Sequence, residues 1–159
     1  MFNKSLTCKV DVKAPARDVW GVVSAVAAYH RWNPFIVFGR VMFRQQLESG
    51  RLLEAHLSYN GGKTIEKVTA RILMADTLSE LRWEVETRLP FLYRYEHAFF
   101  INPVNEARVE FVHRRRSKGL LSPFIRLFTR KRALQAMEAM NEELRKVAEA
   151  REGAGEKSE

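Results

Sequence analysis

The side chains best suited to chemistry in this sequence lie on both sides of the segment NPVNE, at residues 102–106. Alternating apolar and polar runs precede and follow this segment, so it predicts the turn of a β-hairpin. If positions whose numbers sum to 210 are paired, His97 lies opposite His113, and Tyr95 lies opposite Arg115. The hairpin would then bring two imidazoles, a phenol and a guanidinium to one place.

The apolar residues of the hairpin support this pairing. In the same register Ile101 faces Val109 and Phe99 faces Phe111, whereas a slip of one residue would set these side chains against charged ones. The shared face is mostly apolar with a few convergent polar groups, which is typical of a small-molecule pocket. The candidate ligand-binding residues of this face and of the preceding run are Trp83, Val85, Tyr95, His97, Phe99, Phe111, His113 and Arg115.

The two opposed histidines allow three interpretations. They could be core residues with hydrogen-bonded rings, polar contacts for a ligand, or, with Tyr93 and Tyr95, the acid and base of a cyclase or dehydratase. Zinc is disfavoured because it needs three or four ligands and the other histidines, His30 and His56, fall on other elements. We predict no metal and no cofactor, and we assign no catalytic residue. A hairpin turn explains the glycine pair at residues 60–62, so this pair does not indicate a phosphate-binding loop.

An arginine that faces inward keeps its charge and needs an anion or an aromatic ring. Tyr95, opposite Arg115 in the assumed register, could supply the ring. We therefore hypothesise that Arg115, with His113 or His97, holds the acidic or carbonyl end of an otherwise apolar ligand. In the alternative, Arg115 lies at the rim of the sheet and its guanidinium reaches water.

Hydrophobic periodicity predicts the elements that position these side chains. Residues 5–13 alternate as a half-buried strand, and Asn33 before Pro34 ends the helical region that follows it. The predicted order is a strand, a helix from Pro15 with one or two further turns, six strands between Phe35 and about Lys118, and a long helix from Ser122, as N-cap, to about Ala150.

The long C-terminal helix carries the apolar stripe that should lie on the sheet. The stripe consists of Leu127, Leu134, Met137, Met140, Leu144 and Val147. Residues 1–150 are therefore expected to form a single domain, and residues 151–159 a disordered polar tail.

Charge is concentrated in one segment of the 159 residues. The net charge is +8, and residues 108–132 hold nine Lys or Arg and one Glu, so the rest of the chain is neutral. No run approaches the length of a membrane span or resembles a signal sequence, and Cys8 has no partner cysteine. We expect a soluble protein in the cytoplasm, with contact at a membrane surface as a further option.

Short motifs that together match a known pattern are spread over residues 5–150. Their residues are Ala14, Pro15, Val19, Trp20, Tyr29, Trp32, Asn33, Pro34, Phe35, Gly50, Leu81, Trp83, His97, Phe99, Ile101, Pro103, Gly119, Leu120, Leu121, Met140, Asn141 and Leu144. The ordered set resembles the SRPBCC or START-like superfamily, in particular its polyketide cyclase/dehydrase branch. The sequence departs from that pattern at one position, because Arg115 stands where many relatives carry an acidic residue.

The resemblance implies an α+β helix-grip fold, with a curved antiparallel sheet of seven strands around a long C-terminal helix, over a cavity for a hydrophobic ligand. Carriage of a lipid, isoprenoid or polyketide-like molecule without catalysis is the favoured function, and an aromatase/cyclase or dehydratase is the alternative. Several domains of this kind form homodimers, but no residue here reveals an interface. Residues that would close the cavity mouth, and so join the candidate ligand-binding set, are Leu121, Phe124 and Phe128.

The basic segment also predicts a surface for anions. Cations interleaved with large apolar residues suit an anionic membrane, or they form a solvated face beside the cavity mouth. A nucleic-acid partner is disfavoured because no nucleic-acid-binding motif accompanies the charge. The candidate surface residues are Arg114, Arg116, Lys118, Arg126, Arg130, Lys131 and Arg132.

Overall fold

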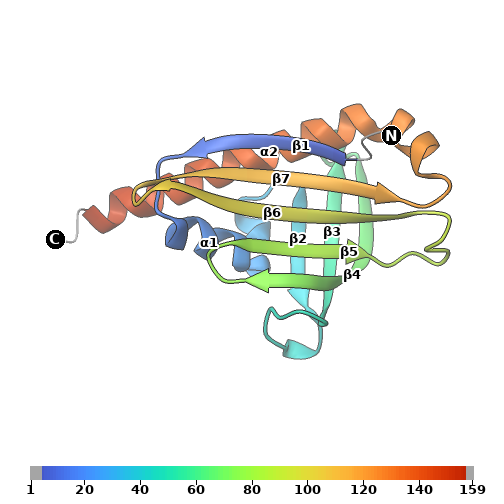
Figure 1. Ribbon diagram of the computed structural model, residues 1–159, viewed down its shortest axis with the longest axis horizontal. Helices are drawn as coiled ribbons and strands as arrows, with labels where there is room; N and C mark the ends of the chain where they lie inside the picture. Colours follow the sequence, from blue (N-terminus) through green and yellow to red (C-terminus); the bar gives the residue numbers. More distant parts are fainter. Residues whose placement is uncertain (1–4, 157–159) are drawn as a thin grey trace.

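The computed structural model describes the backbone of residues 5–156 and the side chains of residues 5–154. Seven strands form one antiparallel sheet in the order β1-β7-β6-β5-β4-β3-β2. Figure 1 shows β2 and β3 crossing behind the other strands, so the sheet is strongly curved, and the helix α2 runs along it. The elements are β1 (Ser5–Val12), α1 (Ala16–Ser24), η1 (Val26–Arg31), β2 (Ile36–Val41), η2 (Met42–Arg44), β3 (Leu52–Tyr59), η3 (Asn60–Gly62), β4 (Thr64–Asp76), β5 (Glu80–Val85), β6 (Arg94–Asn105), β7 (Arg108–Lys118) and α2 (Ser122–Glu156).

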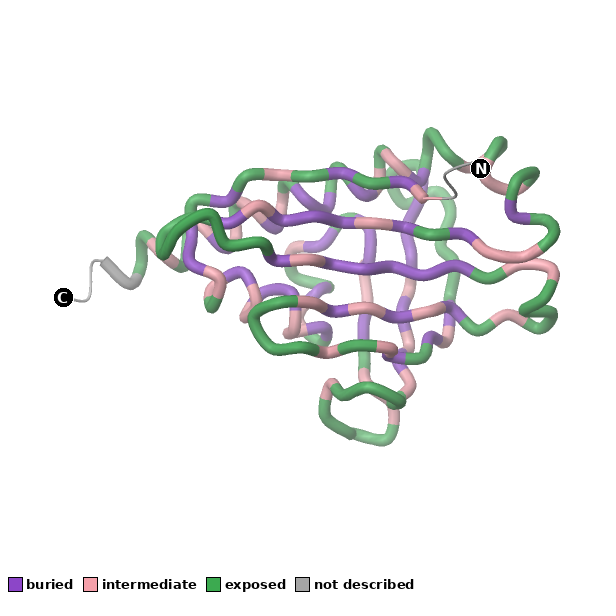
Figure 2. The backbone as a smooth tube through the Cα atoms, in the orientation of Figure 1, coloured by how far each residue is buried: buried purple, intermediate pink, exposed green. Residues whose placement is uncertain are grey.

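This order confirms the predicted fold class, a seven-stranded helix-grip arrangement with six strands between the first helices and the last. The alternation of β1 buries Leu6, Cys8 and Val12, as the sequence predicts. Figure 2 shows that burial follows the middle strands, and α2 also contributes buried residues from Ala133 to Ala148. The core therefore lies between α2 and the concave face of the sheet.

The bend from η1 into β2 is built by Asn33. Its side-chain oxygen accepts hydrogen bonds from the backbone N–H of Phe35, at 2.9 Å, and of Ile36, at 2.8 Å. Trp32 packs edge-to-face on Tyr29, with ring centroids 5.4 Å apart. The aromatic corner is thus a structural joint that directs Phe35 into the core, where its side chain is fully buried.

The register predicted for the β6–β7 hairpin is wrong by two residues. The observed pairs are His97 with Arg115, Phe99 with His113 and Ile101 with Phe111. The strands continue further than the motif NPVNE suggests, because β6 includes Pro103 and the turn lies at Glu106 and Ala107, after a bulge. A shift by two residues keeps every side chain on its predicted face, so the same residues still point inward.

Helix α2 differs from its prediction at both ends. It starts at Ser122, but the side-chain oxygen of Ser122 is buried without a hydrogen-bond partner, so the predicted N-cap bond is not made. At the other end the helix continues to Glu156, and residues 157–159, the rest of the predicted tail, lie outside the described residues. Its buried apolar residues are Ala133, Met137, Met140, Leu144 and Ala148.

Leu127 does not belong to the buried stripe of α2, because its side chain is 75% exposed. The helix buries apolar residues against the sheet from Ala133 onward, whereas Phe124, Leu127 and Phe128 in its first turns are exposed. Within residues 5–156, no helix is both long enough and apolar enough to cross a bilayer.

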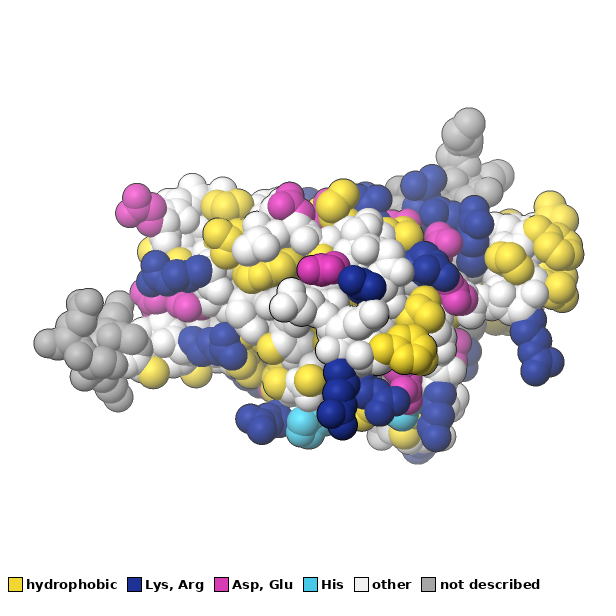
Figure 3. All heavy atoms as spheres, turned by 90° about the horizontal axis from the view of Figure 1, so that it is seen from below, with side chains coloured by type: hydrophobic (Ala, Val, Ile, Leu, Met, Phe, Trp, Pro, Cys, Tyr) yellow, Lys and Arg dark blue, Asp and Glu magenta, His cyan; other side chains and the backbone are white. Residues whose placement is uncertain are grey.

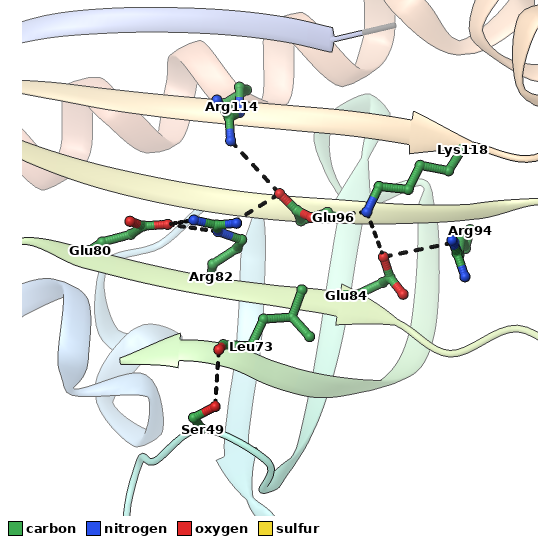
Figure 4. A network of polar contacts seen from close by, with 9 residues as sticks. All are labelled: Ser49, Leu73, Glu80, Arg82, Glu84, Arg94, Glu96, Arg114 and Lys118. Atoms are coloured by element: carbon green, nitrogen blue, oxygen red, sulfur yellow. Dashed lines mark hydrogen bonds and ion pairs between the residues drawn. The ribbon is translucent and has the colours of Figure 1, made fainter. Parts of the chain in front are cut away.

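The convex face of the sheet carries a network of ion pairs around one buried carboxylate. Glu96, only 3% exposed, lies 3.3 Å from the amine of Lys118 and 3.8 Å from the guanidinium of Arg114. Lys118 also contacts Glu84 at 3.1 Å (Figure 4). Two of the predicted surface cations, Arg114 and Lys118, are therefore partnered within the sheet.

Candidate functional site

The two predicted histidines meet at the centre of the molecule. Nδ1 of His97 lies 2.9 Å from Nε2 of His113, and both side chains are fully buried. Their partners here are rings: Trp83 lies 4.7 Å from His97, and Phe99 lies 4.5 Å from His113, between ring centroids. The hypothesis of hydrogen-bonded core histidines describes this arrangement well.

The environment keeps both imidazoles neutral. Burial, followed by the fields of His113 and Arg115, lowers the pKa of His97 well below its usual 6.5. Burial and then Arg115 lower the pKa of His113 to about 3. The second nitrogens, Nε2 of His97 and Nδ1 of His113, are buried without a partner, so one N–H of this pair has no acceptor in the described residues.

Arg115 sits at one end of this aromatic cluster. Its guanidinium lies 4.4 Å from the ring centroid of Tyr95 and donates a hydrogen bond of 3.2 Å to the hydroxyl of Tyr93. Arg115 is only 6% exposed, which contradicts the alternative of an arginine that reaches water at the rim. Among the residues that the structure describes, no carboxylate lies within ion-pair distance of Arg115, and its Nε has no partner.

A cavity of about 180 Å³ opens beside this guanidinium. Tyr95 also faces it and donates a hydrogen bond of 3.0 Å to Glu66. The hydroxyl of Tyr59 is buried without a partner, and Arg132 lies 5.4 Å from the Tyr59 ring. The lining residues are Tyr59, Glu66, Tyr93, Tyr95, Arg115, Ile125, Thr129 and Arg132.

Two tyrosines of this cavity, Tyr59 and Tyr95, are held in their protonated form. Burial, more than any neighbouring charge, raises the pKa of Tyr59 to about 12 and that of Tyr95 well above 10. At neutral pH these hydroxyls can therefore donate or accept a hydrogen bond, but they are poor bases.

The structure brings only part of the predicted ligand-binding set to the cavity. Tyr95 and Arg115 line it, whereas the other predicted residues of β5, β6 and β7 fill the core beside it. Those core residues are Trp83, Val85, His97, Phe99, Phe111 and His113. The three predicted mouth residues are exposed at the start of α2, by 43% for Leu121, 64% for Phe124 and 82% for Phe128.

Several residues of the cavity were missed because they come from distant segments. Tyr59 ends β3 and Glu66 lies in β4, and nothing in the sequence indicates that they approach β7. Tyr93 was considered only as a catalytic group, and Arg132 only as a surface cation. The available signal was the aromatic alternation of Tyr93 and Tyr95 before the candidate histidines.

The remaining predicted surface cations lie in two groups. Arg116 is exposed on the convex face of β7, whereas Arg126, Arg130, Lys131 and Arg132 lie on the first turns of α2. The described residues contain no group of three or more His, Cys, Asp or Glu that could hold a metal ion.

The curved antiparallel sheet, the long C-terminal helix and the cavity between them define a helix-grip protein of the START-like class. The chain belongs to the family described as polyketide cyclase/dehydrase and lipid transport, whose model matches residues 4–149. Comparison with curated protein sequences gave no match.

Solved structures with the same fold come from several organisms. The aromatase/cyclase ZhuI from Streptomyces sp. R1128 matches with a TM-score of 0.74 and 17% identity, over 92% of this chain and 94% of its own. Norcoclaurine synthase from Thalictrum flavum matches with a TM-score of 0.69 and 13% identity, over 94% and 96%. A START superfamily protein from Mycobacterium smegmatis matches with a TM-score of 0.63 and 18% identity, over 92% and 95%. At these identities the likeness establishes the fold alone.

Proposed function

We propose that this protein binds and carries an amphiphilic small molecule whose acidic or carbonyl oxygen is held by Arg115. The observation that supports this proposal best is the guanidinium itself, which is buried beside a cavity with no carboxylate partner among the described residues. Glu66 lines the same cavity and its field favours the charged guanidinium, but Glu66 is hydrogen-bonded to Tyr95 and forms no direct ion pair with Arg115. Arginine cannot shed its charge, and a buried charge without a direct counter-ion is unfavourable. A ligand oxygen in the cavity would supply that partner.

The groups around Arg115 suit recognition of an oxygen. The unpartnered Nε of Arg115 and the unpartnered hydroxyl of Tyr59 are two further polar atoms available to the ligand. Tyr93 holds the guanidinium in place through the hydrogen bond to its hydroxyl. The family description, which includes lipid transport, agrees with an amphiphilic ligand.

The cavity is matched to the polar end of such a ligand rather than to a whole lipid. Its volume of about 180 Å³ lies below the range of roughly 300–1,000 Å³ that is usual for small-molecule pockets. The apolar part of the ligand would extend past Ile125 toward Leu121, which lies just before α2 and whose carbonyl accepts a hydrogen bond from the backbone N–H of Ile125.

Carriage is favoured over catalysis because the candidate base that lines the cavity, Glu66, already accepts a hydrogen bond from Tyr95. Tyr59 and Tyr95 are held protonated, and neither histidine lines the cavity. The second candidate function, a cyclase or dehydratase, is favoured by the unpartnered nitrogens of His97 and His113 and by the family description. Turnover of an added polyketide that stops in a His97→Gln variant would establish that second function.

Binding of dodecanoate and of dodecan-1-ol, measured by isothermal titration, tests the proposed site. We expect Arg115→Met to weaken dodecanoate binding by about 10- to 100-fold, the usual worth of a charge-assisted hydrogen bond. Binding of the alcohol should change by no more than about threefold, because the alcohol makes only neutral hydrogen bonds.

Arg114→Met is the matched control, since Arg114 is the neighbouring arginine of β7 but points to the convex face, toward Glu96. It should leave the affinities for both probes unchanged. Equal losses of both probes in Arg115→Met, or the same loss in Arg114→Met, would contradict the assignment of Arg115.

A further inference from the structure

One end of the molecule, where β7 meets α2, exposes a cluster of large apolar side chains. Figure 3 shows hydrophobic side chains gathered at this end, on the right. We call this cluster the apolar tip, and its members are between 43% and 82% exposed. They are Leu89, Phe91, Leu120, Leu121, Phe124, Leu127 and Phe128.

The apolar tip is one continuous surface formed by two segments. The backbone N–H of Leu120 donates to the carbonyl of Phe91 at 3.2 Å, and that of Leu121 donates to the carbonyl of Leu92 at 2.8 Å. These bonds tie the β5–β6 loop to the turn between β7 and α2. The tip therefore has a fixed backbone rather than two independent loops.

The first turns of α2 are apolar on the side that faces away from the domain. Phe124, Leu127, Phe128 and Lys131 recur at i, i+3, i+4 and i+7, so they share one face of the helix. The opposite face is the one that continues into the buried core residues of α2. An apolar stripe that the domain itself leaves uncovered indicates an external partner.

The charge around the tip indicates the kind of partner. Residues 111–137 contain eight Lys or Arg and no Asp or Glu. Arg130 and Lys131 follow the apolar stripe directly on α2, and both are exposed. A hollow of about 270 Å³ lined by Ser5, Leu6, Arg126 and Arg130 adds a second basic feature on the same helical turns.

We propose that the apolar tip inserts into the surface of an anionic lipid bilayer, with the cations of α2 against the lipid headgroups. Apolar side chains that enter the acyl boundary, together with Lys and Arg near the phosphates, are the two attractions that hold proteins at such surfaces. A second copy of the chain fits less well, because each copy brings a net charge of +8 to the contact. This docking does not depend on the ligand proposed for Arg115.

Flotation of the full chain with lipid vesicles tests the proposal. The protein should float with vesicles of phosphatidylcholine mixed with phosphatidylglycerol, but not with phosphatidylcholine alone, and binding should weaken as salt rises. We expect Phe128→Ser to reduce the partition coefficient about tenfold, and Lys131→Gln to reduce it about fivefold.

Matched controls lie elsewhere on the surface. Phe43→Ser removes a phenylalanine that is 78% exposed, close to the 82% of Phe128, and Lys67→Gln removes an exposed lysine of β4. Both controls should float like the unmodified chain, and so should Tyr93→Phe, which alters the Arg115 cavity but not the tip.

Three results would overturn the docking proposal. The first is no flotation with the anionic vesicles. The second is an equal loss of flotation in Phe43→Ser and Phe128→Ser. The third is evidence that the tip has a different partner. In that case the chain would dimerise or bind RNA, this association would be lost in Phe128→Ser, and the vesicles would remain unbound.

Discussion

Acidification from pH 7 to pH 5 should lower the free energy of unfolding by about 4 kcal/mol through His97 and His113 alone. In the folded protein both imidazoles are neutral, because burial lowers the pKa of His97 well below 6.5 and that of His113 to about 3. In the unfolded chain both titrate near the usual 6.5. Below this pKa the unfolded state binds more protons than the folded state. The stability that the two neutral histidines confer is therefore fully present above about pH 6.5 and is lost as the pH falls below it.

Urea unfolding, followed by tryptophan fluorescence at a series of pH values, measures this dependence. Each histidine should contribute a slope of about 1.4 kcal/mol per pH unit below the unfolded pKa, so His113→Gln should halve the combined slope. His30→Gln is the control for loss of an imidazole outside the core, because His30 is exposed. An unaltered slope in His113→Gln would contradict the prediction, because it would mean that His113 takes up its proton as readily in the folded protein as in the unfolded chain.

Substitution of Gly119 should have the second large effect. Gly119 has a φ of +105°, and a β-carbon there would lie 2.5 Å from the carbonyl oxygen of Leu92 and 2.8 Å from the backbone nitrogen of Tyr93. We expect Gly119→Ala to destabilise the protein by about 2–4 kcal/mol, for two reasons. The alanine must adopt a strained positive φ, and the backbone segment at Leu92 and Tyr93 must move to make room for its β-carbon. Dodecanoate binding should weaken too, since the displaced segment carries Tyr93, which holds Arg115.

Gly50→Ala separates the cost of the strained dihedral from the cost of the backbone clash. Gly50 also has a positive φ, of +88°, but no atom lies within 4 Å of the position that its β-carbon would occupy. Its substitution should therefore cost only about 1 kcal/mol, from the dihedral alone. Thermal or urea unfolding of both variants gives the comparison, and equal losses would show that the loop carrying Leu92 and Tyr93 yields without cost.

The central histidine pair was predictable although the assumed register was wrong. Because side chains alternate across a strand, an error of two residues leaves His97, His113 and Arg115 on the concave face. The position of the turn was harder to predict, since Pro103 usually marks the end of a strand but here lies within β6, next to a bulge.

The apolar residues of α2 show a different limit. Leu127 and Met137 fit one helical stripe by spacing, yet Met137 is fully buried and Leu127 is 75% exposed. Periodicity identifies a face of the helix but not the length over which the sheet covers it. Phe124 and Phe128, which were predicted at the mouth of a cavity, are likewise exposed in the first turns of α2.

The sequence by itself determined the elements, their order, the inward faces of the strands and the concentration of positive charge, because these follow from local periodicity and composition. Only the tertiary structure decided that Arg115 shares a cavity with Tyr59, Glu66 and Thr129, and that the histidines lie outside that cavity. Contacts between distant segments depend on strand register, on sheet curvature and on where the helix leaves the sheet, and none of these is encoded in the spacing of nearby residues.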